Sequence, residues 1–218
     1  RLILKSGSIK NAPESHVRAI FTEKNKGTNR FINKGKEETL EIGAGKYEEM
    51  NARKFMLLCR SVIQTAKVNK VKKIAVQFDH IQKFYNPQIA AENFEMANFD
   101  FNIFKTKPEE GWDDIEEIYL AMKFPSAAVE KALKKGQEIG RAVNACRTLA
   151  NTPGGDMTPT SLAMAAKDAV KGVTFDSGGL NLKPSNGIYE MHMDMSGASA
   201  VIHAVALSAR LKLKRHVI

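Results

Sequence analysis

The feature that most restricts the fold is a repeated alternation, over the first 125 residues, of short apolar runs with longer segments of helical spacing. Three runs are typical of strands, at 36–43, 73–78 and 115–121, and the first of them ends in a glycine. Strands separated by helical segments favour a largely parallel sheet, because parallel neighbours need a long crossover connection. The alternation therefore predicts an α/β domain.

Two helices are predicted between these strands. Asn51 can cap a helix over 52–67, whose apolar residues recur at helical spacing, at Phe55, Leu58, Val62 and Ala66. Pro87 suits the first turn of a second helix, for which we expect an apolar stripe of Ala90, Phe94, Ala97 and Phe101.

The remaining residues indicate a second part of the chain. A long helix is predicted over 126–150, ending at the breaker sequence Asn-Thr-Pro-Gly-Gly. Beyond it we expect helices at 159–170 and 197–210, strands at 172–175 and 191–195, and a further strand from His216. We therefore divide the chain into an N-terminal α/β domain (1–125), a linker helix and loop (126–160) and a second, partial α/β domain (161–218).

Composition narrows the class of protein. Hydrophobic residues make up 43% and charged residues 26%, as in globular proteins. No apolar run approaches the ~18 residues of a membrane-spanning helix, and the first ten residues lack the apolar core of a signal peptide. Only Cys59 and Cys146 are present, which excludes a disulfide scaffold. These features predict a cytoplasmic protein without a membrane partner.

The net charge of +9 is unevenly distributed. Residues 1–86 carry 18 Lys and Arg against 8 Asp and Glu, whereas 87–218 carry 15 against 16. A basic half can bind nucleic acid, and this remains an alternative. However, the lysines are dispersed without interleaved aromatic residues, so the pattern favours a solvated surface over a nucleic-acid partner.

The densest group of chemically active side chains lies in KGVTFDSGGLNLKP (171–184) and MHMDMSG (191–197). Asp176 and Asp194 follow or end apolar runs, where carboxylates at neighbouring strand ends can bind hard cations. Lys171 and Lys183 can bind a substrate oxygen or, beside a metal, act as a neutral ligand. The simpler interpretation is a turn at Asp176 and solvated lysines. Spacing alone leaves both open.

Gly43-Ala44-Gly45-Lys46 follows a predicted strand and precedes a helix, as a phosphate-binding loop does. A P-loop needs GxxxxGK followed by Ser or Thr, whereas Tyr47 follows here. We therefore expect an ordinary strand–helix connection.

Two stretches resemble the leucyl aminopeptidase (cytosol aminopeptidase) family: VNACRTLANTPGGDMTPTSLA (143–163) and KGVTFDSGGLNLKP with MHMDMSGASAV (171–201). KEETLEIGAGKYEEMNARKF, from Lys36, is similar to the N-terminal domain of that family. The resemblance implies a macro-like N-terminal α/β domain, a linker helix and a catalytic α/β domain with a mixed, largely parallel sheet. It also implies a hydrolase that releases N-terminal residues, preferably leucine, from peptides by metal-activated water.

The resemblance assigns roles by position. Lys171 matches a lysine that ligates one metal, Asp176 a carboxylate that bridges two metals, and Asp194 a further metal ligand. Lys183 matches a catalytic lysine that polarises the scissile carbonyl. The implied cofactors are two divalent metal ions, Mn²⁺ or Zn²⁺, and the implied partners are peptide substrates and, for full-length members, a cytoplasmic homohexamer.

The sequence also departs from this family. The downstream Asn-Thr-Asp-Ala-Glu-Gly-Arg motif, which supplies two metal-ligating carboxylates and a catalytic arginine, is absent. Family members also carry several dozen residues between the positions of Val170 and Lys171. We therefore expect an internally shortened sequence without the C-terminal part of the catalytic domain. A non-enzymatic assembly or regulatory module is the alternative to the metallopeptidase function.

Overall fold

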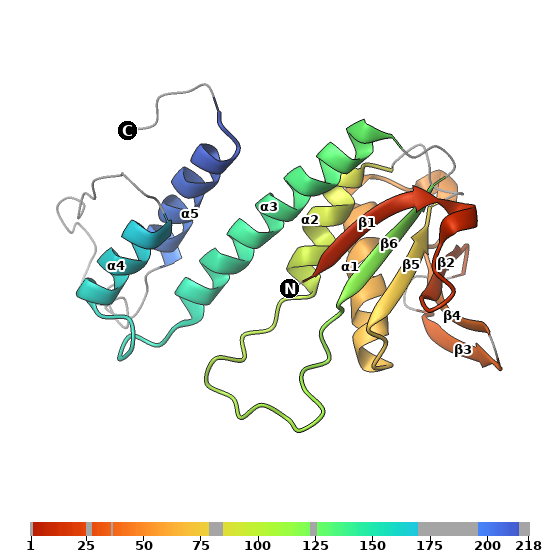
Figure 1. Ribbon diagram of the computed structural model, residues 1–218, viewed down its shortest axis with the longest axis horizontal. Coiled ribbons are helices and arrows are strands. Elements are labelled where there is room, and N and C mark those ends of the chain that lie inside the picture. The colour runs from red at the N-terminus through yellow and green to blue at the C-terminus, as the bar shows by residue number, and fades with distance from the viewer. Residues whose placement is uncertain are drawn as a thin grey trace. The chain divides into compact units, whose positions relative to one another are not determined.

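A computed structural model describes six stretches of the chain: residues 2–24, 28–35, 37–78, 85–122, 126–169 and 196–213. They form two compact units, residues 1–140 and 141–218, and each unit is described by itself. The first unit contains a six-stranded sheet with its helices, and the described regular elements of the second are helices (Figure 1).

The first unit contains six strands, two short 3-10 helices, two helices and the beginning of a third: β1 (Ile3–Ser8), η1 (Ile9–Asn11), β2 (Val17–Thr22), β3 (Arg30–Lys34), β4 (Glu37–Gly43), η2 (Tyr47–Glu49), α1 (Ala52–Val68), β5 (Lys73–Gln77), α2 (Pro87–Ala97), β6 (Glu117–Met122) and α3 (Ala127–Asn151). The second unit contains the end of α3, α4 (Pro159–Ala169) and α5 (Ser196–Arg210).

The strand order is β1-β6-β5-β2-β4-β3. Every neighbouring pair is parallel except β3 with β4, which are antiparallel. The prediction of an α/β fold with a largely parallel sheet is thereby confirmed. Parallel strands explain why α1 and α2 lie between sequential strands, since each crossover must return the chain to the same end of the sheet.

Three strands were missed by the sequence analysis: β1, β2 and β3. In β2, buried and exposed residues alternate along Val17–Thr22, which is the period of a strand with one covered face. The other predicted strands within the described residues match β4, β5 and β6 to within two residues. The strands predicted at 172–175, 191–195 and from His216 lie outside the described residues.

The apolar core lies on one face of the sheet. The stripe predicted for α1 is confirmed, because Phe55, Leu58, Val62 and Ala66 are all at most 5% exposed. The Asn51 side chain caps this helix by accepting a hydrogen bond from the backbone N–H of Lys54 at 3.0 Å. These residues pack against the inward-facing side chains of the strands in one continuous cluster.

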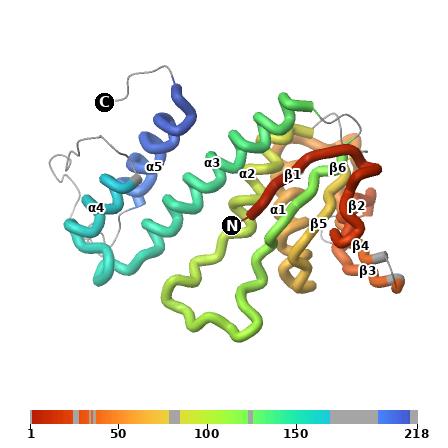
Figure 2. The backbone as a smooth tube through the Cα atoms, viewed as in Figure 1, coloured from red at the N-terminus to blue at the C-terminus, as the bar shows by residue number. Residues whose placement is uncertain are grey.

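The stripe predicted for α2 extends too far at its end. The helix ends at Ala97, so Phe101 lies beyond it. The Asn98 side chain donates to the backbone oxygen of Ile115 at 2.8 Å and accepts from the N–H of Ile115 at 2.9 Å. This pair joins the two ends of the long connection to β6, whose course Figure 2 follows. Asn98 therefore ends α2 and holds together the two ends of the loop that follows it.

The first half of α3 packs closely against α2. A Cβ added at Gly136 would lie 2.3 Å from the backbone oxygen of Gln88, and one at Gly140 would lie 2.6 Å from Cβ of Glu95. Between the two glycines, Gln137 donates to the backbone oxygen of Leu2 at 3.2 Å. The part of the predicted linker helix before Arg141 thus belongs to the first unit. The proposed boundaries at 125 and 160 stay a prediction.

Candidate functional site

The four residues predicted to form the metal site, Lys171, Asp176, Lys183 and Asp194, lie outside the described residues. The structure does describe the helices on either side of them in the sequence. α4 ends at Ala169 and α5 begins at Ser196, so the predicted site segment joins these two helices. The described residues nearest to the predicted site in sequence are therefore those of α4 and α5.

A small apolar core holds the helices of the second unit together. Leu149 of α3 and Ile202 and Ala206 of α5 are each at most 8% exposed. Side chains of α4 and of the preceding turn pack against them: Met157, Leu162, Ala165 and Ala166. Helices α4 and α5 are in contact, so the two ends of the predicted site segment belong to one packed layer (Figure 1).

The beginning of α5 is attached to α3 by a buried serine. Ser199 is fully buried, and its Oγ donates to the backbone oxygen of Cys146 at 2.8 Å and lies 3.3 Å from the Cys146 Sγ. Nδ1 of His203 lies 2.8 Å from the backbone oxygen of Ser199, one helical turn earlier. These polar atoms are occupied by local contacts. Their position fixes the first turn of α5, immediately after Asp194 in sequence.

The described residues contain no cluster of three or more His, Cys, Asp or Glu side chains arranged to hold a metal ion. Among the described helices, none combines the length and the apolar character needed to cross a bilayer.

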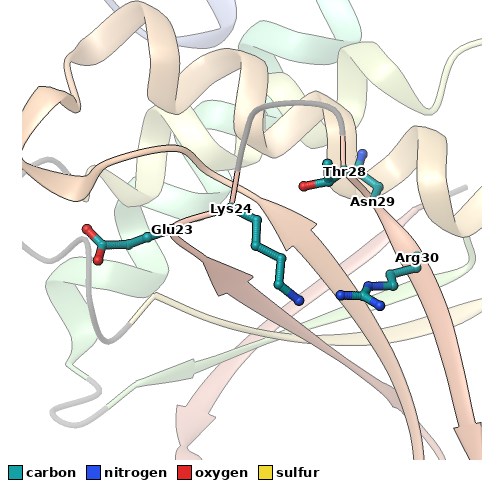
Figure 3. A pocket seen from close by; sticks show the side chains of 5 residues that line it. All are labelled: Glu23, Lys24, Thr28, Asn29 and Arg30. Carbon is teal, nitrogen blue, oxygen red and sulfur yellow. The ribbon is translucent and has the colours of Figure 1, made fainter.

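One depression of about 580 Å³ is lined by polar residues that follow the end of β2 or lie at the start of β3 (Figure 3). The charged ends of Lys24 and Arg30 point toward each other, while Glu23 points away from them. Both cations bind Glu41 on β4: Lys24 Nζ lies 2.5 Å from one carboxylate oxygen and Arg30 Nε lies 3.0 Å from the other. The Lys24 hydrogen bond, with Arg30 nearby, lowers the pKa of Glu41. This carboxylate therefore neutralises much of the local positive charge.

A second depression of about 330 Å³ lies beside the Gly43–Lys46 loop. The backbone N–H groups of Gly43, Ala44 and Gly45 donate to Asn29 Oδ1, Thr22 O and Lys24 O, at 3.2, 2.8 and 2.9 Å. A phosphate-binding loop keeps such groups free for the ligand. The geometry therefore favours the ordinary strand–helix connection.

Many lysines of the basic N-terminal half form ion pairs. Lys67 Nζ lies 2.6 Å from Asp100 and 3.5 Å from Asp114, and Lys5 Nζ lies 2.7 Å from Glu117. A phosphate-binding surface needs unpaired cations arranged along a stripe. Pairing with carboxylates reduces the free positive charge of this half, so the observations do not favour the nucleic-acid alternative.

Two family models match the chain, and both describe the same family. The model of the cytosol aminopeptidase family N-terminal domain matches residues 21–108, and that of the catalytic domain of this family matches residues 170–218. The second match contains all four predicted site residues. Together with the α/β fold, these matches define a chain of the aminopeptidase class that carries parts of the N-terminal and catalytic domains of one family.

The chain belongs to the cytosol aminopeptidase family. It is 26% identical to the probable cytosol aminopeptidase of Bacillus subtilis (strain 168), over 99% of this chain and 53% of the relative. It is 27% identical to that of Roseiflexus castenholzii (strain DSM 13941 / HLO8), over 82% of this chain and 49% of the relative. The chain thus spans about half the length of the curated relatives that it matches.

The Bacillus subtilis alignment extends over 278 positions, whereas this chain has 218 residues. The relative therefore carries residues within the matched region that this chain lacks. This difference agrees with internal shortening, and its location between Val170 and Lys171 stays a prediction.

Solved structures show the same fold. A mutant of tomato leucine aminopeptidase superposes with a TM-score of 0.74 at 14% identity, covering 98% of this chain and 60% of that chain. The bottromycin maturation enzyme BotP superposes with a TM-score of 0.66 at 17% identity, covering 90% and 56%. BotP has also been solved in complex with Mn, with a TM-score of 0.62 at 18% identity.

Proposed function

We propose that this chain supplies the N-terminal domain and part of the metal site of an aminopeptidase that releases N-terminal residues, leucine preferred, from peptides. The observation that carries the proposal is the match of residues 170–218 to the catalytic domain of the cytosol aminopeptidase family. The relatives named cytosol aminopeptidase support a peptide substrate and a cytoplasmic location. Homohexamer formation is part of the same proposal.

The chemistry of the donor set fits divalent cations. In this proposal Lys171, Asp176 and Asp194 would hold two divalent ions: Asp176 would be shared by both, Asp194 would supply a hard oxygen and the Lys171 amine a nitrogen. When bound, two such ions lower the pKa of water and stabilise the tetrahedral oxygens of peptide hydrolysis. Lys183, held outside the ligand set, donates hydrogen bonds to the developing oxyanion of the scissile carbonyl. Mn²⁺ and Zn²⁺ are the proposed ions.

Three ligands are few for two ions, because a catalytic zinc ion alone commonly has about three protein ligands. Lys171, Asp176 and Asp194 therefore form an incomplete set, and we infer that further donors must complete the site. The second candidate function is a non-enzymatic assembly or regulatory module. The two candidates differ in turnover but share the same metal-binding residues.

The test combines metal binding with hydrolysis. Mn²⁺ binding to the purified 218-residue chain is measured by calorimetry, and hydrolysis of leucine amide is measured with Mn²⁺, with Zn²⁺ and with neither. We expect Asp176→Asn to weaken Mn²⁺ binding, because it removes the bridging charge. Asp168→Asn is the matched control, since Asp168 is an exposed carboxylate of α4 near the site in sequence.

Metal-dependent turnover that Lys183→Ala abolishes, while Mn²⁺ binding persists, supports the enzyme. Mn²⁺ binding without turnover in a folded chain is the result expected both for a chain that holds part of the site and for the module. Equal Mn²⁺ binding by wild type, Asp176→Asn and Asp168→Asn, or no binding at all, contradicts the assigned ligands and with them the proposal.

A further inference from the structure

A short segment between β1 and β2 crosses the face of the sheet that lies opposite the main core. Its two apolar side chains, Ile9 of η1 and Ala12 of the following turn, pack against a small cluster on that face: Ala75, Tyr119 and Ala121. Each residue of this cluster is at most 8% exposed. Residues 9–16, which we call the strap, therefore exclude water from an apolar patch of β5 and β6.

The strap is attached to the sheet mainly by side chains. The N–H of Ala12 donates to the backbone oxygen of Ile9 at 3.3 Å, and the N–H of His16 donates to that of Pro13 at 3.1 Å. Both bonds lie within the strap and do not reach a strand. The packing beneath it is incomplete, since a depression of about 60 Å³ remains between Ile9, Ala12 and the sheet. Segments with few buried contacts open locally without unfolding the rest of a protein.

Two anchors hold the ends of the strap. At its beginning, the Tyr119 hydroxyl donates to the backbone oxygen of Ser8 at 3.1 Å. A Cβ at Gly7 would clash with this hydroxyl, so the glycine lets Tyr119 reach across β1. At its end, His16 inserts its imidazole between the strap and the sheet, where the side chain is 3% exposed. Closure of the strap therefore requires this imidazole to stay buried.

The surroundings of His16 suit a neutral imidazole. Its Nδ1 lies 3.3 Å from Oγ of Ser15, and its buried Nε2 has no hydrogen-bond partner among the described residues. The charged groups that face it come from three strands: Glu117 of β6, Lys5 of β1 and Lys73 of β5. Oε1 of Glu117 lies 3.5 Å from Nε2 but is already bound by Lys5 at 2.7 Å. Protonation would make three cations share one carboxylate in a site that water does not reach.

We propose that the strap is a pH-sensitive cover, closed over the sheet while His16 is neutral and released when His16 is protonated. Release exposes the cluster of Ala75, Tyr119 and Ala121, while the sheet and its helices stay folded. The device lies in the first unit and does not depend on the metal-binding residues.

The direction of the pH effect follows from burial. Burial lowers the pKa of His16 below its usual 6.5, and the attraction of Glu117 does not restore it. In the open strap the imidazole is solvated and binds a proton more readily than in the closed strap. Each pH unit below 6.5 therefore increases the open population by up to about tenfold, until the pKa of the closed state is reached.

The test follows hydrogen exchange by NMR in the full 218-residue chain at pH 7.5, 6.5 and 5.5, corrected for the intrinsic effect of pH on exchange. The amides of Ala12 and His16 report the strap, and those of Ala75 and Leu120 report the sheet. We expect strap exchange to increase roughly three- to tenfold from pH 7.5 to 5.5, while sheet exchange changes much less.

Variants separate the two anchors. His16→Gln keeps a neutral polar side chain that cannot be protonated, and it should remove the pH dependence of strap exchange. Tyr119→Phe removes the anchor at Ser8, so it should raise strap exchange about fivefold at every pH and leave the pH dependence intact. Glu14→Gln changes an exposed carboxylate of the strap and is the matched control that should alter neither.

Four results would overturn the proposal. Strap exchange independent of pH would exclude the device. An equal increase in strap and sheet would show that His16 affects only global stability. Slower strap exchange at pH 5.5 would show that protonated His16 strengthens the strap through Glu117. A pH dependence that persists in His16→Gln would assign the effect to another group.

Discussion

Replacing Gly136 by alanine tests whether α3 packs as closely on α2 as the structure indicates. The added Cβ would lie 2.3 Å from the backbone oxygen of Gln88 and 2.8 Å from the Cβ of Ala91. Neither atom belongs to the free end of a flexible side chain, so one helix must shift. Overpacking of this kind costs up to about 3 kcal/mol. The better helix propensity of alanine offsets about 1 kcal/mol. We expect a net loss of about 2 kcal/mol.

The assay uses the single tryptophan of the chain. Trp112 lies in the first unit, so its fluorescence reports the unfolding of that unit alone. A loss of about 2 kcal/mol corresponds to a decrease of roughly 4–8 °C in the midpoint for a protein of this size. Lys135→Ala, at the exposed neighbouring position of the same helix, is the matched control and should stay within about 0.5 kcal/mol.

Replacing an ordinary glycine inside a helix by alanine stabilises the protein. If Gly136→Ala leaves the stability unchanged or raises it, the close approach of the two helices is wrong. Gly140→Ala provides a gradation, since its Cβ would lie 2.6 Å from Cβ of Glu95 and 3.1 Å from the backbone oxygen of Glu92. It should destabilise the first unit by less than Gly136→Ala does.

Three further predictions concern the first unit. Phe55→Ala removes a fully buried ring and should cost about 3–5 kcal/mol in urea unfolding. Asn98→Ala leaves the N–H and the oxygen of Ile115 without their partner, and should cost about 1–3 kcal/mol and increase hydrogen exchange at Ile115. Burial, with Lys73 nearby, lowers the pKa of His16 below its usual 6.5 despite Glu117. The unfolded chain therefore binds a proton more readily, and stability should fall as pH decreases from 6.5 through the folded pKa. His16→Gln should flatten this decrease in urea midpoints measured between pH 7.5 and 5, and an unchanged slope would contradict it.

The elements that sequence analysis found are those with a strong local signal. The capped α1 and the proline at the start of α2 were predicted correctly because caps and apolar periodicity act within one turn. The end of α2 was not, since Asn98 ends the helix through a bond to Ile115, seventeen residues later. β1 pairs with β6, more than a hundred residues away, so its neighbours give no local signal.

For the candidate site, local residue patterns were less informative than the family resemblance. Physical reasoning from the residues left the metal site and the simple turn both open, because an aspartate before two glycines is also typical of a turn. The resemblance to a family supplied the roles, and the match of residues 170–218 supports the family.

The charge distribution illustrates why counts along the sequence mislead. Residues 1–86 carry an excess of cations, yet several of these pair with carboxylates of 100–117, which the count assigned to the other half. Lys70 binds Glu110 at 3.0 Å, and Lys67 binds Asp100. The fold therefore neutralises the cations at the end of α1. The location of unpaired cations in the fold, more than the net charge, determines where a partner of opposite charge can bind.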